Sequence, residues 1–468
     1  MSIPQRMDGY RPLVALSAPL AGIQLAQVAL TTTDLIIMGS LGFRAIAAGG
    51  LAITLHNQLR TMCVGVVTAA GNLVAGTTGR GEARAGDQQL DEQARNEVRQ
   101  VVRASFLVAT LVGLLGAVGL IGLSYALTWF GQDIWVAALA HPTMIALAPG
   151  LVPMLWLNIL RQFAVGMRRP GSLLGVTIVS IGFNVVLDGG FAYGWLGFPV
   201  LGLTGIGLAT TIVQVLNFLV FLKILRRDQQ LAPLLSVQGW KADKAIAREV
   251  FRLGVPISLT YGSEAGITSV ATLLMGSFGP LTLAAQNAVN QLTYIVYQAN
   301  IGLSHGSSIL VSRAIGQGNR KEAARIARRA LILGATAMAL VGLLYLIIPT
   351  LLILPFLDLN ADPAVESMAR TLLLFGIAQQ FLKGAQNISI GLLRGLSNTK
   401  SGFRITLIGY WVIGIPVMLI FAYGLGLQGP GVWIGLCVGF GSTAVLLLRR
   451  FRKDLHQPRS VSHGSCSS

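Results

Sequence analysis

Three acidic residues, Asp34, Asp188 and Glu264, lie in stretches of the chain that are otherwise apolar. A charged side chain at the centre of a bilayer-spanning helix costs roughly 2.5–3.5 kcal/mol, so an acid kept there is expected to have a function, such as binding a proton or Na⁺. Asn184 and Asp188 are spaced i, i+4, so on a helix both side chains share one face and converge on one ion. The alternatives are a structural polar pair for these two residues, and a place at the membrane interface for Asp34.

Two further apolar stretches carry polar side chains at helical spacing. The first stripe is Asn287, Asn290, Gln291, Tyr294, Tyr297 and Gln298, and the second is Gln379, Gln380, Lys383, Gln386 and Asn387. Each set falls on one helix face, which is too polar for lipid and suits the binding of large organic molecules in a cleft. The candidates for the lining of this cleft are Arg60, Gln291, Tyr294, Tyr297, Gln298, Lys383 and Asn387. Hydrogen bonding between helices is the alternative for the stripes, and snorkelling or pairing with an acid is the alternative for Arg60.

The composition places these residues in a membrane. Hydrophobic residues make up 53% of the 468 residues and charged residues only 11%, whereas soluble proteins carry roughly 25% charged residues. Apolar stretches long enough to span a bilayer occur at 14–37, 46–77, 101–127, 143–163, 172–193, 204–225, 253–275, 284–312, 331–355, 371–393, 405–425 and 431–448. We therefore expect an all-α polytopic membrane protein with twelve transmembrane helices.

The basic residues follow the expected membrane topology. The formal net charge of +17 is compatible with nucleic-acid binding, but 31 of the 35 Lys and Arg lie in the N-terminal arm, the C-terminal tail or the connections after even-numbered spans. This distribution is typical of the cytoplasmic side of a membrane protein. We predict a multi-pass protein of the cell (inner) membrane with both termini in the cytoplasm, in contact with membrane lipids and without a nucleic-acid partner.

The two halves of the chain repeat each other. Residues 19–79 match residues 256–316 at a constant offset, so that Met38-Gly39-Ser40 corresponds to Met275-Gly276-Ser277. Further along, Phe191-Ala192-Tyr193-Gly194 reappears as Phe421-Ala422-Tyr423-Gly424. A duplicated unit with an even number of spans predicts two six-helix lobes related by a pseudo-two-fold axis along the membrane normal.

This duplication also predicts the domain organisation. We expect an N-lobe over residues 1–225, a cytoplasmic linker over 226–252, a C-lobe over 253–450 and a cytoplasmic tail over 451–468. Two lobes that face each other across a central cleft are suited to alternating access.

Signatures of catalysis and of nucleotide binding are absent from the sequence. No Gly-Lys dipeptide occurs, so there is no phosphate-binding loop, and the five histidines lack metal-ligand spacing. The run from Gly424 to Gly429 matches a dinucleotide-binding pattern but joins two expected spans without a preceding strand. We expect a protein that is not an enzyme, acts as a monomer, and needs no metal and no cofactor beyond its coupling ion, H⁺ or Na⁺.

Four short sequence motifs identify a protein family more specifically together than any one of them does alone. They are Thr33-Asp34-Leu35 leading to Met38-Gly39-Ser40-Leu41-Gly42, Asn184-Val-Val-Leu-Asp188 followed by Gly202-Leu-Thr-Gly205, Pro256 with Glu264 before Leu274-Met275-Gly276, and Gly391-Leu-Leu-Arg394-Gly395. With the six-helix duplication, they make the chain similar to the multidrug and toxic compound extrusion (MATE) family of secondary antiporters over nearly its whole length. The resemblance implies export of cationic or amphipathic organic compounds in exchange for H⁺ or Na⁺. A flippase or exporter of a lipid-linked or natural-product substrate in the same superfamily is the alternative.

The resemblance also suggests where the coupling ion binds. In DinF-type members coupling is attributed to N-lobe acids, which correspond to Asp34 and Asp188 with Asn184. In NorM-type members it is attributed to a C-lobe site, where Glu264 is present but the acid of the tenth span is replaced by Lys383. A lysine at this position is able to pair with Glu264 as a tethered cation. We therefore expect proton coupling in the N-lobe and small, cationic organic substrates in the cleft.

Overall fold

The computed structural model describes residues 9–86, 90–129, 132–170, 173–356 and 363–456. Within these ranges the chain is helical and contains no strand. Ten long helices are continuous: α1 (Arg11–Ser40), α2 (Phe43–Ala85), α3 (Glu92–Ala126), α6 (Leu173–Tyr193), α7 (Leu203–Arg227), α8 (Lys244–Ser277), α9 (Pro280–Gly316), α10 (Arg320–Ile347), α12 (Pro363–Gly395) and α15 (Gln428–His456).

Two further spans are composite. The fourth consists of α4 (Ile134–Leu147) and α5 (Leu151–Gly166), joined by a 3₁₀ turn, and the eleventh of α13 (Thr399–Leu407) and α14 (Ile415–Leu419), which alternate with π-helical turns. The helix α11 (Pro349–Ile353) and the 3₁₀ turns at 195–197, 232–234, 239–241 and 354–356 are short connecting elements. Each of the twelve predicted spans thus coincides with one long helical element.

Most of these elements are apolar enough to lie in a bilayer. Nine of the described elements have the length and composition of membrane spans, and α8, α9 and α12 are the long helices outside that set. These three helices carry Glu264 and the two predicted polar stripes. Their lower hydropathy therefore marks the interior of the bundle.

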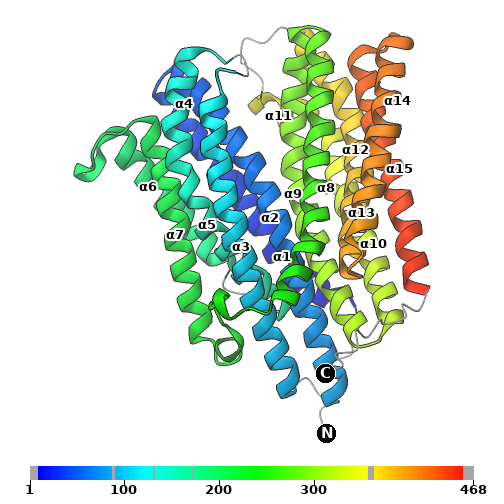
Figure 1. Ribbon diagram of the computed structural model, residues 1–468. Coiled ribbons are helices and arrows are strands. Elements are labelled where there is room, and N and C mark those ends of the chain that lie inside the picture. The colour runs from blue at the N-terminus through cyan, green and yellow to red at the C-terminus, as the bar shows by residue number, and fades with distance from the viewer. Residues whose placement is uncertain (1–8, 87–89, 130–131, 171–172, 357–362, 457–468) are drawn as a thin grey trace.

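The helices form two lobes (Figure 1). Helices α1–α7 make up the N-lobe and α8–α15 the C-lobe, with α1 and α2 contacting α8 and α9 across the interface. Because α1 is equivalent to α8 and α2 to α9, the contact of α1 with α9 is equivalent to that of α8 with α2. The beginning of α1 and the end of α15 lie at the same end of the bundle (Figure 1). The predicted fold class is confirmed.

The sequence repeat is also a structural repeat. Gly42 and Gly279 precede the second helix of each lobe with nearly identical dihedral angles, φ 106°, ψ 167° and φ 103°, ψ 168°. This positive-φ conformation favours glycine. In both lobes the serine of the Met-Gly-Ser phrase hydrogen-bonds to the tyrosine of the Phe-Ala-Tyr-Gly phrase, Ser40 to Tyr193 and Ser277 to Tyr423. The two independent sequence repeats therefore meet in space, once in each lobe.

Glycines at the end of the repeat let the lobes approach closely. A Cβ atom on Gly79 would lie 2.3 Å from the carbonyl oxygen of Arg313, and one on Gly316 would lie 2.3 Å from the carbonyl oxygen of Gly76. Gly79 and Gly316 occupy equivalent repeat positions. Backbone contacts here join α2 and α9 near the end of the bundle where the termini lie.

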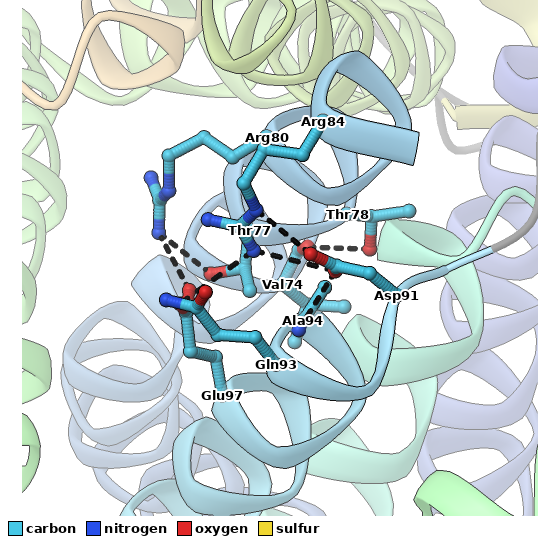
Figure 2. Close-up of polar contacts among 9 residues, drawn as sticks. All are labelled: Val74, Thr77, Thr78, Arg80, Arg84, Asp91, Gln93, Ala94 and Glu97. Atoms are coloured by element: carbon cyan, nitrogen blue, oxygen red, sulfur yellow. Dashed lines mark hydrogen bonds and ion pairs between the residues drawn. The ribbon is translucent and has the colours of Figure 1, made fainter. Parts of the chain in front are cut away.

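Ion pairs link the end of α2 to the beginning of α3. In Figure 2 the Arg84 Nε donates to Asp91 at 2.8 Å, Arg80 contacts Glu97 at 3.5 Å, and Asp91 accepts a hydrogen bond from the Ala94 backbone to cap α3. The hydrogen bond from Arg84 holds the pKa of Asp91 below its usual value. These contacts join the end of α2 to the beginning of α3 and partly neutralise the basic charge there.

The linker between the lobes packs against α3. Arg99 Nε donates to the carbonyl oxygen of Pro233 at 2.7 Å, and Arg103 Nε to Ser236 Oγ at 2.8 Å. Helix α8 begins at Lys244, so part of the expected linker (226–252) is helical. The linker is therefore a short segment bound to the N-lobe.

Candidate functional site: a central cavity between two acid sites

A cavity of about 370 Å³ lies between the lobes. Its walls come from α1, α2 and α5 of the N-lobe and from α8, α9 and α12 of the C-lobe. Six of the seven predicted cleft residues line it, namely Arg60, Tyr294, Tyr297, Gln298, Lys383 and Asn387. Gln291 is half-buried on α9 and is not among the lining residues. The volume lies in the range of pockets for drug-sized molecules.

Other lining residues were not predicted. They include Gln24 and Gln27 on α1, Asn158 and Gln162 on α5, and Tyr261 and His305 on the C-lobe helices. Those on α1 and α5 are spaced by three and four residues, which is the same signal that identified the stripes of α9 and α12. Arg161, which the charge count assigned to a basic connection, lies inside α5 and faces the cavity.

Glu264 lies in the C-lobe wall of this cavity and is paired with a lysine. Its Oε1 is 3.3 Å from Lys383 Nζ, so the structure contains the expected ion pair. The ammonium group also lies over the Tyr297 ring, 4.1 Å from its centroid, and Asn387 Nδ2 donates to the Tyr297 hydroxyl at 2.8 Å. We call Glu264, Lys383, Tyr297 and Asn387 the C-lobe acid site. Its carboxylate already has a cation beside it.

Asp34 and Asp188 lie deep in the N-lobe, where α1 packs against α6. Asp34 is 5% exposed, Asn184 1% and Asp188 0%, so Asp34 is not at an exposed interface. Asp34 Oδ1, both oxygens of Asp188 and the side-chain amide of Asn184 are buried without a hydrogen-bond donor or acceptor among the described residues. We call these three residues the N-lobe acid site.

The two carboxyl groups of this site interact directly. Asp34 and Asp188 are close enough for a hydrogen bond between their side chains when one of them is protonated. No Lys or Arg of the described chain forms an ion pair with either residue. Two neighbouring buried carboxylates repel each other strongly, so the arrangement is suited to holding a proton between them.

A second, smaller cavity lies beside the central one in the N-lobe. It has a volume of about 70 Å³, and Asp34 lines it, whereas Asn184 and Asp188 do not. Four residues, Gln27, Arg60, Asn158 and Arg161, line both cavities. The two spaces therefore share one polar wall, through which a change of charge at Asp34 can affect a ligand in the centre.

A buried polar layer closes the interface of the lobes near the termini. Glu82 of α2 forms an ion pair with Arg313 of α9 and accepts a hydrogen bond from Gln317 Nε2 at 2.8 Å. Nearer the middle of α2, Asn72 Nδ2 donates to Ser308 Oγ and to Ser312 Oγ, both at 2.8 Å. These contacts join the lobes on the side of the central cavity where the ends of the described chain lie.

The twelve-helix duplicated fold, with a polar cavity between its lobes, defines a membrane transporter. The family model described as MatE matches residues 19–188 and 256–420, one segment in each lobe. The chain belongs to the MatE family, whose members are transporters and not enzymes.

Relatives and solved structures agree with this assignment. The chain is 32% identical to the "Probable multidrug resistance protein NorM" of Brucella suis biovar 1 over 97% of its own length and 95% of that protein. The protein of the same description from Pseudomonas aeruginosa is 32% identical over 96% and 90%. An outward-facing multidrug resistance MATE family transporter superposes with a TM-score of 0.85 at 16% identity, covering 96% of this chain and 97% of that one. The eukaryotic MATE transporter AtDTX14 does so with a TM-score of 0.79 at 19% identity, covering 95% and 97%.

Proposed function

We propose that this protein is a multidrug efflux antiporter that exports amphipathic organic compounds in exchange for protons. The observation that carries the proposal is the N-lobe acid site, in which Asp34 and Asp188 are buried beside each other without a cation. Such a pair binds a proton more readily than it stays doubly charged. The relatives named for multidrug resistance support the efflux of drugs.

Sodium coupling at the C-lobe acid site is the less favoured possibility. Lys383 Nζ lies 3.3 Å from Glu264 Oε1 and already supplies this carboxylate with a cation. An incoming sodium ion would have to displace an ammonium group tethered by its own helix. We therefore place the coupling proton on Asp34 and Asp188.

The proposed cycle starts from the contacts that hold the lobes together near the chain ends. The beginning of α1 and the end of α15 lie on the side of the bundle where Glu82 and Arg313 form an ion pair. In the proposed topology, with both termini cytoplasmic in the cell inner membrane, the lobes are closed toward the cytoplasm. Opening the cavity to the cytoplasm requires this ion pair to separate, and proton release from the N-lobe acid site accompanies the rocking of the lobes.

A susceptibility assay tests the proposal. A host strain that lacks its own efflux pumps should tolerate higher concentrations of several amphipathic organic compounds, such as fluoroquinolones, when it expresses the protein, and the D188N variant should lose this tolerance. Unchanged susceptibility to the whole panel, at confirmed membrane expression, would contradict drug efflux. If deletion also caused a cell-envelope defect, the alternative of a flippase would be favoured. The arginines in the cavity wall are compatible with that alternative, because they could bind an anionic group of a lipid-linked substrate.

A further inference from the structure

The charges that line the central cavity do not balance. The charged side chains in its wall are Arg60, Arg161, Lys383 and Glu264. Glu264 is neutralised by Lys383 at 3.3 Å. The two guanidinium groups remain without an acid, because no ion pair of either arginine occurs in the described part of the chain. The cavity therefore presents two uncompensated positive charges.

The two arginines come from different helices but face the same space. Arg60 belongs to α2 and Arg161 to α5. Both side chains line the central and the smaller cavity. Arg60 Nε is buried and has no hydrogen-bond partner among the residues described. Asp34 is the acid that shares the smaller cavity with them, but its electrostatic partner is Asp188.

Such a pair is a binding site for an anion. A buried charge without a partner is costly, and an anionic group placed between two guanidiniums relieves both the repulsion and the desolvation. The planar guanidinium matches carboxylate and phosphate groups with two parallel hydrogen bonds. The cavity also has apolar and aromatic lining residues, among them Ile23, Tyr261 and Tyr294, which suit the organic body of an amphipathic compound.

We propose that the central cavity binds an amphipathic organic compound through an anionic group, a carboxylate, sulfonate or phosphate, held between Arg60 and Arg161. The compound is either an anion or a zwitterion. This inference rests on the proposed transport function and specifies its substrate class. It replaces the expectation of a cationic substrate. Such a substrate would be favoured if the three buried acids faced the cleft. Of these, Glu264 is paired, Asp34 lines only the side cavity and Asp188 lines neither.

Direct binding to the full-length protein in lipid nanodiscs tests the inference without any ion gradient. The probes are 2-naphthylacetate, its methyl ester and 2-naphthylmethyl-trimethylammonium, which share one aromatic body and differ in charge. Calorimetric titration, with empty nanodiscs as the blank, should give the carboxylate an affinity about tenfold or more above that of the ester, as expected for a hydrogen-bonded charge pair. Equal affinity for the carboxylate and the ester, or tighter binding of the ammonium compound, would overturn the inference without any variant.

Variants then assign the site. R60Q and R161Q should each lower the affinity for the carboxylate by about tenfold and leave that for the ester unchanged, and R60K should retain part of the preference for the carboxylate. R44Q is the matched control, because Arg44 lies on the same helix α2 but outside both cavities. Loss of all binding in R60Q with R161Q unchanged would contradict a shared site.

The lipid composition of the nanodisc identifies the source of the anionic group. If phosphatidylglycerol competes with the carboxylate probe and phosphatidylcholine does not, the natural occupant is a lipid headgroup. If neither lipid competes, the occupant is a free organic anion. Both results retain the anion site. Failure of proton coupling in a transport assay would leave these binding results intact, so the inference and the proposed function can fail separately.

Discussion

The two acid sites of the molecule occupy lobes with the same architecture but treat their carboxylates in opposite ways. The lobes agree in the dihedral angles of Gly42 and Gly279 and in a Ser–Tyr hydrogen bond. In the C-lobe, however, Glu264 has a lysine 3.3 Å away, whereas Asp34 and Asp188 in the N-lobe have only each other. The lobes thus share one scaffold and differ in the charge partners of their acids, and in the proposed mechanism the N-lobe copy is the one that exchanges a proton.

This difference has a simple physical basis. In an ion pair between two side chains of one protein, the cation is tethered and cannot be exchanged. In a pair of buried carboxyl groups, the bound proton can be exchanged, and the charge of the pair changes when the proton binds or leaves. The comparison therefore predicts that variants in the N-lobe acid site abolish coupling and that variants in the C-lobe acid site alter ion selectivity.

The largest effect is expected from the D188N variant. Removing this carboxyl leaves Asp34 without the neighbour that makes it bind a proton, so substrate flux driven by a pH gradient should fall by about tenfold or more, which corresponds to about 1.4 kcal/mol or more. Flux of a fluorescent substrate in proteoliposomes measures this. The matched control is D133N at the N-cap of α4, where asparagine can also accept the hydrogen bond from Trp135. Wild-type flux in D188N would remove the N-lobe acid site from the mechanism.

A smaller effect is expected from K383M. This variant removes the tethered cation and leaves Glu264 free in the cavity wall, where an external cation can bind. Substrate flux should become dependent on Na⁺, by roughly fivefold or more between zero and saturating Na⁺. In the double variant E264Q/K383M the sodium dependence should disappear again. If K383M stays indifferent to Na⁺ while it is folded and active, the lysine does not act as the internal cation of this site.

The smallest effect tests the similarity of the lobes. Tyr193 and Tyr423 make equivalent hydrogen bonds to Ser40 and Ser277, so Y193F and Y423F should each cost about 0.5–1.5 kcal/mol and lower the unfolding temperature by about 1–2 °C. The shifts should be alike in both lobes. Y125F is the control, because the Tyr125 hydroxyl has no hydrogen-bond partner in the described chain. Clearly unequal shifts would show that the two copies of the scaffold differ in stability as well as in charge.

The sequence predicted the scaffold better than the cavity. Membrane spans follow from hydropathy alone, and the stripes of α9 and α12 follow from spacing, so six cleft residues were found. Periodicity also placed Gln291 on the polar face of α9, but it does not tell how a helix is rotated toward its neighbours, and Gln291 lies outside the lining. The same limit applies to Arg161. The sequence does not decide whether this residue belongs to a basic connection or reaches the cleft, and only the packing of α5 shows that it faces the cavity.

The contacts between the lobes could not be predicted from the sequence for a different reason. Glu82 and Arg313 each lie at a helix end among other charged residues, where nothing local distinguishes a solvated side chain from a buried one. Their pairing depends on the close approach of α2 and α9 at Gly79 and Gly316. Long-range contacts of this kind require the three-dimensional structure.

The central claim, that the N-lobe acid site couples transport to protons, is tested most directly by imposing one gradient at a time on proteoliposomes. The substrate is the compound to which expression gives the greatest protection in cells. Vesicles with an acidic interior and equal Na⁺ on both sides should take up this compound, and vesicles with an imposed Na⁺ gradient at equal pH should not. Uptake that follows the Na⁺ gradient and ignores the pH gradient would contradict the assignment.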